Sequence, residues 1–362
     1  MFKGLKVATV LAAGAFALAA CGSSSTTTTP SSSSPSASDT ASSSSSPSTS
    51  PSTSSLKVGM AYDIGGRGDK SFNDSAAAGL DEAVQKLGVT SKELSAVPNE
   101  TDAQKAARLT LLAQGGYDPI IAVGFAYAPA LKTVSAKFPN IHFAIVDDSS
   151  VTASNVASLV FAANQASYIV GVIAAQASKK ASVGYIGGVK VPLLESFQKG
   201  FDAGVTATNS AVKITDKYLT LPPDFSGFNA PDKGKATAAG MFDAGADVVY
   251  AAAGGSGSGV FTAAKASAGS WAIGVDSDQY LSADAAVKDI ILTSALKNVN
   301  VAVFDVIQAA SKGAPLSGVQ TYDLKNGGVG YSKSNPAVQP YEAKADAAAQ
   351  AIIAGTITVP GS

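Results

Sequence analysis

Acidic and basic side chains stand at the ends of two short apolar segments in the last third of this chain. The segment 273–275 runs straight into Asp276, and Lys297 closes the segment 292–296. A carboxylate can accept hydrogen bonds from two neighbouring sugar hydroxyls, and a lysine beside it can donate to the same hydroxyls and keep the carboxylate ionised. The residue types equally allow an ion pair across a hinge, so the pair alone does not decide between a ligand site and a structural contact.

A second group of candidate residues follows the first apolar segment, 57–62. Asp63 ends this segment, a glycine-rich turn follows, and Phe72 and Asn73 then fall on the first turn of a predicted helix. An aromatic face beside an amide and a carboxylate suits a flat heterocycle with polar edges. The alternative places Phe72 against a sheet and Asn73 in solvent. The turn lacks the Gly-Lys-Ser/Thr order of a phosphate-binding loop, and its acidic residue would repel phosphate.

Two loops offer backbone or capping groups. Gly254 and Gly255 open a loop rich in glycine and serine that ends where a helix is expected to begin. It lacks the spacing of a dinucleotide-binding motif, but its amides can bind hydroxyls or an anion at the helix start; a plain flexible loop is the alternative. In the earlier turn, Asp69 or Ser71 is expected to cap the next helix by accepting its free amide hydrogens.

The composition excludes several classes of chemistry. The chain has one cysteine and one histidine, Cys21 and His142, which leaves no ordinary ligand set for a zinc or redox-metal site, and no cofactor is expected. Most Ser-His-Asp and Cys-His arrangements are excluded as well unless His142 serves, and its place in the apolar run 141–146 indicates a core or edge histidine. With 26 basic and 27 acidic residues, nothing in the charge indicates a nucleic-acid partner.

Residues 1–21 have the pattern of an export signal. Lys3 and Lys6 precede an apolar run of about a dozen residues, shorter than the roughly 20 residues of a membrane-spanning helix. Cys21 follows Leu-Ala-Ala, which resembles the lipobox of bacterial lipoproteins, where the cysteine is acylated and becomes the new N-terminus. We therefore expect the protein at the extracytoplasmic face of the cell membrane, held by lipid on Cys21. The alternative is a plain secretion signal with an incidental cysteine.

Residues 22–55 are predicted to form a disordered tether. They are almost wholly Ser, Thr, Pro and Ala, with Asp39 as the single charge, so they offer too little apolar surface to offset the entropy of ordering. A flexible coil of this length spans roughly 30–35 Å, enough to hold a folded domain away from a membrane.

Short apolar segments alternate with alanine-rich helical segments through the rest of the chain. Strands are predicted at 57–62, 119–123, 143–146, 183–186, 248–251 and 271–275. Helices are predicted at 71–87, 129–137, 166–177, 194–206 and 260–268. This alternation predicts parallel sheets covered on both faces. In such α/β folds ligands bind beyond the carboxyl ends of the strands, which is where the candidate residues stand.

Together the candidate segments resemble the basic membrane protein family of bacterial lipoproteins, the PnrA-like substrate-binding components of ABC importers. The matching segments are 63–74, 184–188 with Pro192, 197–204, 254–265, 273–279 and 294–297. The resemblance implies an α/β chain with the type I periplasmic-binding-protein fold: two doubly wound parallel-sheet lobes, joined by three crossovers, with a ligand cleft at the hinge. The expected lobes are 56–162 plus 280–318 and 163–279 plus 319–362.

The family further implies a purine nucleoside as the ligand, an ABC permease as the partner, and a monomeric receptor that is not an enzyme. Carried over to this chain, Phe72 would stack on one face of the base, and Phe197 is the candidate for the opposite face. Asp63 and Asn73 would bind the polar edge of the base.

The ribose hydroxyls would go to Asp276 and Lys297, helped by the backbone at Gly254 and Gly255, with Asp147 lining the same cleft. These assignments follow from the resemblance and extend the chemistry that the residue types allow on their own.

Two features depart from the family pattern. Asp147 is followed directly by Asp148, so either carboxylate could face the ligand. Gln165 stands where an acidic residue is expected in relatives, so contacts near that crossover are expected to differ.

Two other functions remain open. A receptor of the same fold for a sugar or a signalling molecule would keep Asp276 but would leave the aromatic pair without a role. A nucleoside hydrolase would use Asp63, Asp69 or Asp276 with bound calcium, but these aspartates lie in different segments rather than in one dense acidic cluster.

Overall fold

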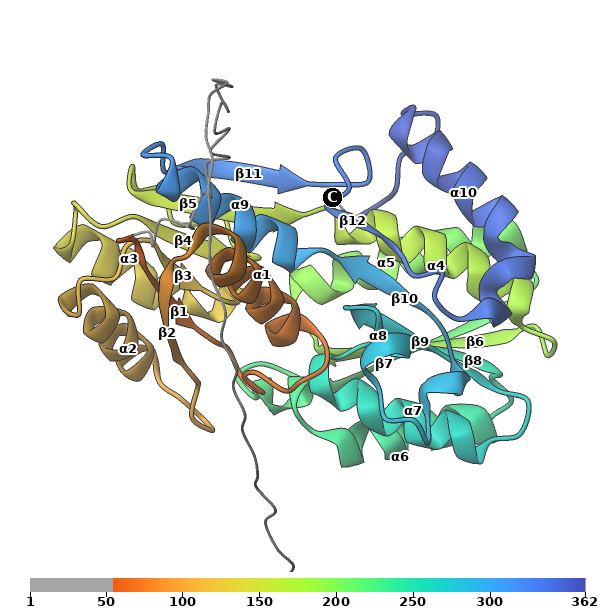
Figure 1. The fold of residues 1–362 in the computed structure, drawn as a ribbon. Coiled ribbons are helices and arrows are strands. Elements are labelled where there is room, and N and C mark those ends of the chain that lie inside the picture. Colours follow the sequence, from red (N-terminus) through yellow and green to blue (C-terminus); the bar gives the residue numbers. More distant parts are fainter. Residues whose placement is uncertain (1–54, 362) are drawn as a thin grey trace, which may run out of the picture. The chain divides into compact units, whose positions relative to one another are not determined.

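The computed structural model describes residues 55–361. The predicted signal segment with Cys21, and the tether up to residue 54, lie outside these residues. Within residues 55–361, helices and strands alternate along the chain and form two α/β lobes, each built on a six-stranded sheet (Figure 1). This arrangement confirms the predicted pair of doubly wound lobes.

The sheet of the first lobe has the strand order β11-β5-β4-β3-β1-β2, and all neighbouring strands run parallel. Its strands are β1 (Lys57–Ala61), β2 (Thr90–Leu94), β3 (Ile120–Ala122), β4 (Phe143–Val146), β5 (Val156–Phe161) and β11 (Gly318–Tyr322). Its helices are α1 (Phe72–Leu87), α2 (Asp102–Gln114), α3 (Ala128–Lys137) and α9 (Val299–Ser311). The apolar faces of α1 and α9 pack on one face of the sheet, and those of α2 and α3 pack on the other.

The sheet of the second lobe has the order β12-β10-β9-β8-β6-β7, and only β12 runs antiparallel to its neighbour. Its strands are β6 (Ser182–Val189), β7 (Lys213–Thr220), β8 (Val248–Ala252), β9 (Trp271–Asp276), β10 (Ile291–Lys297) and β12 (Val329–Tyr331). Its helices are α4 (Ala163–Ala177), α5 (Pro192–Thr208), α6 (Pro231–Asp243), α7 (Gly257–Ala266), α8 (Gln279–Ser282) and α10 (Gln339–Ile353). One face is covered by α4 and α5, with α10 against α4, and the other by α6 and α7. None of the helices within residues 55–361 combines the length and apolar character needed to cross a membrane.

Burial on both faces explains why the central strands could be recognised. Every residue of β4 and β8 is buried, so each strand is a continuous apolar run. All the predicted strands and helices occur, with ends within a few residues of those expected. The edge strands β2 and β7 are largely polar and exposed or half-buried, and the apolar pattern predicts neither.

Strand pairing corrects the expected lobe boundaries. The chain crosses between the lobes three times, from β5 into α4, from β10 into α9 and from β11 into β12. The segment 280–318 was expected in the first lobe, but β10 pairs with β9 and therefore belongs to the second sheet. The first lobe instead receives α9 and the whole of β11, which begins at Gly318. The expectation was wrong because the apolar pattern of a strand does not identify its pairing partner.

The helices α4 and α5 approach each other closely at Gly204. A Cβ atom at this position would lie 2.0 Å from the carbonyl oxygen of Tyr168. The two backbones can therefore pack at this distance only if the residue has no side chain.

We expect Gly204→Ala to lower the free energy of unfolding by about 1–3 kcal/mol, because α5 must shift away from α4. Gly240 lies inside α6 with nothing within 4 Å of a Cβ position, so Gly240→Ala should instead raise it by about 0.5–1 kcal/mol. Urea unfolding followed by circular dichroism measures both variants. Effects of the same sign and size would contradict the close approach of α4 and α5.

Candidate functional site

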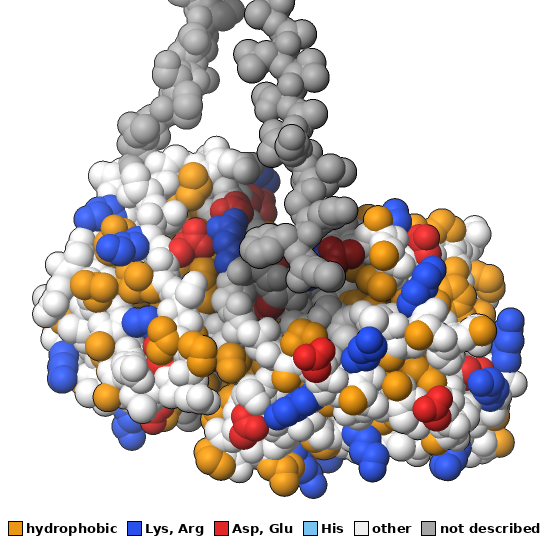
Figure 2. Space-filling view, turned by 90° about the horizontal axis from the view of Figure 1, so that it is seen from below, with side chains coloured by type: hydrophobic (Ala, Val, Ile, Leu, Met, Phe, Trp, Pro, Cys, Tyr) orange, Lys and Arg blue, Asp and Glu red, His pale blue; other side chains and the backbone are white. Residues whose placement is uncertain are grey.

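A cleft lies between the lobes, where strands from both sheets end. It encloses about 570 Å³ of space outside the protein atoms, including the part open to solvent. The space-filling view shows the surface hollowed between the two halves of the molecule, with acidic and basic side chains beside the hollow (Figure 2). The predicted site residues that line the cleft are Asp63, Phe72, Asn73, Asp147, Phe197, Gly254, Asp276 and Lys297.

Of the predicted ligand-binding residues, all of which lie within residues 55–361, Gly255 alone does not line the cleft. It follows Gly254 in the short helix η3 (Gly254–Ser256), where the chain turns away from the cleft. The space beside its α-carbon is taken by Asn229, Phe228 and Asp69. The structure therefore brings only the first glycine of this loop to the cleft.

Lys297 lies at the centre of the charged groups in the cleft. Its Nζ lies 2.6 Å from Oδ2 of Asp147 and 3.5 Å from Oδ1 of Asp276. The three side chains are only 4%, 4% and 7% exposed. Asp147 follows β4 of the first sheet and Lys297 ends β10 of the second, so the shorter contact is an ion pair between the lobes.

Asp147 and Asp276 occupy equivalent places in the two lobes. Asp147 directly follows β4 and Asp276 ends β9, and each of these strands is third in the order of its sheet. Both residues have a left-handed backbone, with φ of 67° and 62°. Aspartate and asparagine adopt this conformation more readily than other residues that have a side chain. Two equivalent strand ends therefore bring two carboxylates to one cation.

Burial and charge act against each other in this group. Burial raises the pKa of Asp147, and the ammonium of Lys297 opposes that effect. Burial acts to lower the pKa of Lys297, but the carboxylates of Asp147 and Asp276 more than reverse it and hold this pKa above its ordinary value of 10.5. One cation thus lies between two carboxylates, and the group carries an excess of negative charge.

One oxygen of this group has no partner among residues 55–361. Asp147 Oδ1 is buried and accepts no hydrogen bond from them, whereas Oδ2 accepts one from Lys297. A buried acceptor without a donor costs about 1–3 kcal/mol, so Oδ1 is well suited to accept a hydrogen bond from a ligand. The neighbouring Asp148 instead accepts hydrogen bonds from the N–H and hydroxyl groups of Ser150. Of the two adjacent aspartates, Asp147 is therefore the one that lines the cleft.

Ser71 is a member of this group that the sequence analysis did not identify. Its fully buried hydroxyl donates a hydrogen bond of 2.8 Å to Oδ2 of Asp276. The hydroxyl of Ser277 in turn donates to the carbonyl oxygen of Ser71 at 2.7 Å. Ser71 belongs to the first lobe and Asp276 to the second, so these bonds fix the orientation of the Asp276 carboxylate across the cleft.

Asp69, and not Ser71, caps α1. Its carboxylate accepts the backbone N–H groups of Ser71 and Asn73, each at 2.9 Å. The side-chain amide of Asn73 donates to the same carboxylate at 2.9 Å and to the carbonyl oxygen of Ile64 at 3.3 Å, while its Oδ1 accepts the N–H of Asp63. Both amide hydrogens of Asn73 are thus used within the protein. Asn73 lines the cleft, but it orients the loop and has only a lone pair of Oδ1 left for a ligand.

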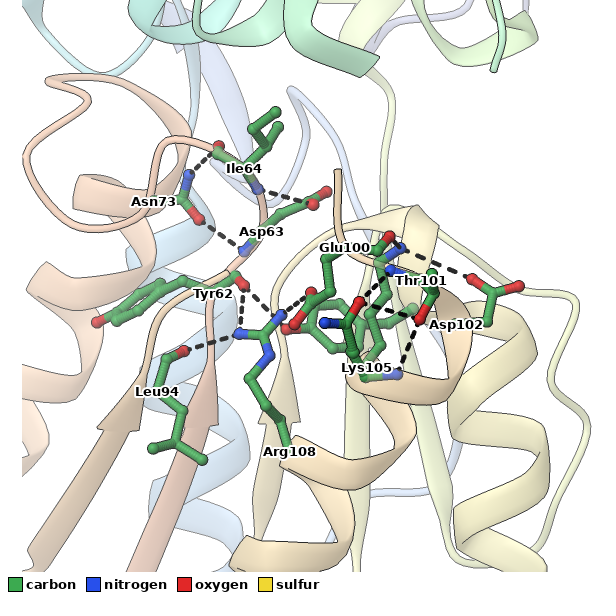
Figure 3. A network of polar contacts seen from close by, with 12 residues as sticks. Tyr62, Asp63, Ile64, Asn73, Leu94, Glu100, Thr101, Asp102, Lys105 and Arg108 are labelled. Atoms are coloured by element: carbon green, nitrogen blue, oxygen red, sulfur yellow. Dashed lines mark hydrogen bonds and ion pairs between the residues drawn. The ribbon is translucent and has the colours of Figure 1, made fainter. Parts of the chain in front are cut away.

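A network of charged and polar groups holds the ends of β1 and β2 beneath Asp63 (Figure 3). The guanidinium of Arg108 donates to the carbonyl oxygens of Tyr62 and Leu94, each at 3.1 Å. The same guanidinium forms an ion pair with Glu100, whose side chain is 5% exposed. Arg108 therefore joins two strand ends and is neutralised by its own partner.

The carboxylate of Asp63 points away from this guanidinium (Figure 3). Its Oδ1 accepts the N–H of Ile64 at 2.8 Å. Burial raises the pKa of Asp63 to about 6, although the Ile64 hydrogen bond and the charges of Lys105 and Arg108 act to lower it. Asp63 thus lines the cleft as a carboxylate without a cation in direct contact among residues 55–361.

Phenyl rings from both lobes form apolar walls of the cleft. The rings of Phe72 on α1 and Phe197 on α5 lie 4.5 Å and 5.6 Å from Nζ of Lys297, within the range of cation–π contacts. Phe125 and Phe228, which the sequence analysis missed, also line the cleft, and their ring centroids lie 6.4 Å apart in an edge-to-face contact. Phe125 follows β3 closely, so the rule that ligands bind beyond strand ends could have identified it. Phe228 follows the unpredicted strand β7.

Gln165, where an acidic residue was expected in relatives, lies at the crossover into α4. Its Oε1 accepts the N–H of Leu324 at 3.0 Å, and it is not among the residues that line the cleft. Gln165 therefore takes part in the contact between two crossovers.

The carboxylates considered for a calcium-dependent hydrolase lie in the cleft but form no cluster. Asp63, Asp69 and Asp276 all line it. Within residues 55–361, however, no three His, Cys, Asp or Glu side chains are grouped in a way that could hold a metal ion.

The two lobes and the cleft define the class: a substrate-binding protein with the type I periplasmic-binding-protein fold. The solved structure of an ABC transporter solute-binding protein from Aeropyrum pernix K1 is similar with a TM-score of 0.75 and 28% identity, over 85% of this chain and 94% of that chain. A second such structure, from Conexibacter woesei DSM 14684, is similar with a TM-score of 0.69 and 22% identity, over 85% of this chain and 99% of that chain.

Sequence relatives define the family. The chain is 34% identical over 326 residues to the ABC transporter nucleoside-binding protein BmpA of Lactococcus lactis subsp. cremoris (strain MG1363). This alignment covers 85% of this chain and 90% of that protein. It is 31% identical over 290 residues to an uncharacterized lipoprotein of Pyrococcus abyssi (strain GE5 / Orsay), over 76% of this chain and 69% of that protein. The model of the Bmp family, described as ABC transporter substrate-binding protein PnrA-like, matches residues 56–362. The chain belongs to this family, as its resemblance predicted.

We expect Lys297→Met to lower the free energy of unfolding at pH 7.5 by about 3–5 kcal/mol, because two buried carboxylates lose their cation. Adding Asp147→Asn should recover part of this loss, since one of the two charges is then removed. Chemical denaturation measures both effects.

Lys333 provides a matched control for this experiment. It also contacts two carboxylates, those of Asp346 at 2.8 Å and Glu342 at 3.6 Å, but its side chain is 45% exposed. Lys333→Met should therefore cost less than about 1 kcal/mol. Equal losses for the two lysine variants would mean that burial does not set the strength of the Lys297 group.

Proposed function

We propose that this protein binds purine nucleosides between its lobes and delivers them to the permease of an ABC importer, held at the extracytoplasmic face of the membrane by lipid on Cys21. One observation carries the proposal. The cleft combines phenyl rings from both lobes with a buried carboxylate oxygen that has no donor among residues 55–361. A purine riboside offers what this cleft requires: a flat aromatic base and adjacent hydroxyl donors.

The base binds among the aromatic walls. Phe72 and Phe197 belong to opposite lobes and line the same space. Stacking of a base on an aromatic side chain contributes roughly 1–3 kcal/mol. Asp63 faces the polar edge of the base, and Asn73 holds the backbone of Asp63 in position.

The ribose binds the charged group at the centre of the cleft. Its hydroxyls donate to Oδ1 of Asp147 and to Asp276, and accept from Lys297. A ligand without these hydroxyls leaves buried acceptors unpaired and is disfavoured for that reason. The backbone at Gly254 lines the same cleft and contributes to this binding.

The mechanism makes and breaks no covalent bond. A nucleoside favours the closed arrangement because only there can both lobes contact it, and the closed form is what the permease receives. The name of the Lactococcus lactis relative, a nucleoside-binding protein, supports the nucleoside as ligand. The family supports the permease as partner, and the relative named as a lipoprotein supports the lipid anchor.

We expect titration calorimetry to detect binding of inosine, guanosine or adenosine, and no competition by free ribose at equal concentration. Phe72→Ala removes a stacking surface, and Asp276→Asn removes a charged acceptor while keeping a side chain that tolerates the left-handed backbone. Each should weaken binding at least tenfold, or by about 1.4 kcal/mol.

Two variants outside the cleft serve as controls for this experiment. Phe304 is partly buried against the same apolar core as Phe72 but does not line the cleft. Asp148 adjoins the site and hydrogen-bonds only to Ser150 among the described residues. Phe304→Ala and Asp148→Asn should leave the affinity unchanged. Unchanged affinities in Phe72→Ala and Asp276→Asn as well would remove the site assignment.

The anchor is tested separately, since Cys21 lies outside the described residues. We expect Cys21→Ser to release the protein from the membrane fraction of expressing cells, because a serine hydroxyl is not acylated at this position. Immunoblots of membrane and soluble fractions measure the distribution. Retention of the variant in the membrane fraction would contradict the lipid anchor.

A further inference from the structure

We propose that Asp63 selects among purine bases through its own protonation: the ionised carboxylate favours nucleosides of 6-oxopurines, and the protonated carboxyl favours nucleosides of 6-aminopurines. The inference rests on the proposed function, because it assumes that a purine nucleoside occupies the cleft. It adds a residue that decides which base is preferred at a given pH.

The two oxygens of Asp63 have different surroundings. Oδ1 accepts the N–H of Ile64 at 2.8 Å. Oδ2 lies beside Gly124, where a Cβ atom would be only 2.4 Å away. Gly124 also has φ of +110°, a backbone conformation open to glycine and strained for other residues. Among residues 55–361 no donor reaches Oδ2, so this oxygen is free to meet a ligand in the cleft.

The charged and polar groups around Asp63 form ion pairs or hydrogen bonds with other residues. On α2, the Arg108 guanidinium is paired with Glu100, and the ammonium of Lys105 lies 3.7 Å from Asp102. In the helix η1 (Phe125–Tyr127), the hydroxyl of Tyr127 donates to a backbone carbonyl. None of these groups bonds directly to the Asp63 carboxylate.

The remaining charged groups of the cleft belong to other contacts. Asp69 is linked to the Asp63 backbone only through Asn73. Lys297 is held between Asp147 and Asp276 in the part of the cleft that takes the ribose. The state of the Asp63 carboxylate is therefore decided mainly by its own burial and by the group that a ligand places against Oδ2.

The two kinds of purine base differ in whether they place a hydrogen-bond donor or an acceptor against Oδ2 of Asp63. At N1, hypoxanthine and guanine carry an N–H donor, whereas adenine has a lone pair. An ionised carboxylate accepts from N1–H but leaves the adenine N1 facing a second acceptor, and unpaired buried polar groups are strongly rejected. A protonated carboxyl donates its proton to the adenine N1 and accepts from the 6-amino group. Binding of adenosine thus takes up one proton from solvent, and binding of inosine takes up none.

The titration of Asp63 falls in an accessible range. Burial raises its pKa to about 6, so the free protein carries an ionised Asp63 at pH 7.5 and a protonated one at pH 5. Lowering the pH across this range should strengthen adenosine binding by about thirtyfold and weaken inosine binding by about tenfold, if each ligand binds a single protonation state.

The test compares inosine and adenosine by calorimetry at pH 7.5 and pH 5, at each pH in two buffers with different enthalpies of ionisation. The ratio of adenosine to inosine affinity should rise about 300-fold from pH 7.5 to pH 5. At pH 7.5 the buffer dependence should show uptake of one proton with adenosine and none with inosine. Carboxylates that face the ribose meet the same hydroxyls in both ligands, so they do not change this ratio.

Two variants complete the test. Asp63→Asn keeps an acceptor for the Ile64 N–H and cannot titrate, so its affinity ratio should not depend on pH. Asp202 lies on α5 outside the cleft, and burial followed by the charge of Asp216 raises its pKa to about 7. Asp202→Asn should keep the full pH dependence of the wild-type protein, although it removes another group that titrates in this range.

The outcomes separate this inference from the proposed function. Binding of both nucleosides with a ratio that does not change with pH overturns the role of Asp63 and leaves the proposed function intact. Absence of binding for both nucleosides at both pH values overturns the two together. If Asp63→Asn fails to fold, proton uptake by the wild-type protein still decides the question.

Discussion

Three charges buried between the lobes constrain the rest of this structure. An ammonium and two carboxylates can leave water only when they contact one another closely, since the effective penalty is several kcal/mol for each ion. Lys297 meets Asp147 of the opposite lobe at 2.6 Å and Asp276 of its own lobe at 3.5 Å. The lobes must therefore approach until the side chains at the ends of β4, β9 and β10 contact one another. This separation of the lobes also sets the width of the cleft.

The same group explains why the cleft is suited to a polar ligand with an apolar face. It has negative charge in excess and an oxygen of Asp147 without a donor among residues 55–361, so hydroxyl groups satisfy it better than further charges would. The rings of Phe72 and Phe197 lie beside this group and form an apolar wall of the cleft. Ser71 holds Asp276 from the opposite lobe, so the acceptor is fully oriented only when the lobes are together.

The sequence predicted the strands that carry the site better than it predicted how they meet. Asp276 could be found because it ends a buried apolar strand, and Phe72 because it begins the helix that follows such a strand; strand ends face the cleft in a parallel α/β fold. Phe228 could not, because it follows the polar edge strand β7, and neither could the sheet to which β10 belongs. The hydrogen bond from Ser71 to Asp276 joins residues 205 positions apart. Contacts of this kind depend on how the lobes close and leave no local pattern in the sequence.

The left-handed backbone at Asp147 and Asp276 has an evolutionary consequence. Only glycine, asparagine and aspartate adopt such φ values at low cost, and both strand ends have them. Asparagine and glycine are therefore the substitutions that these two positions tolerate best. Any bulkier side chain would strain the backbone. Substitutions that keep this backbone would therefore change the charge of the cleft at these two positions more readily than its shape.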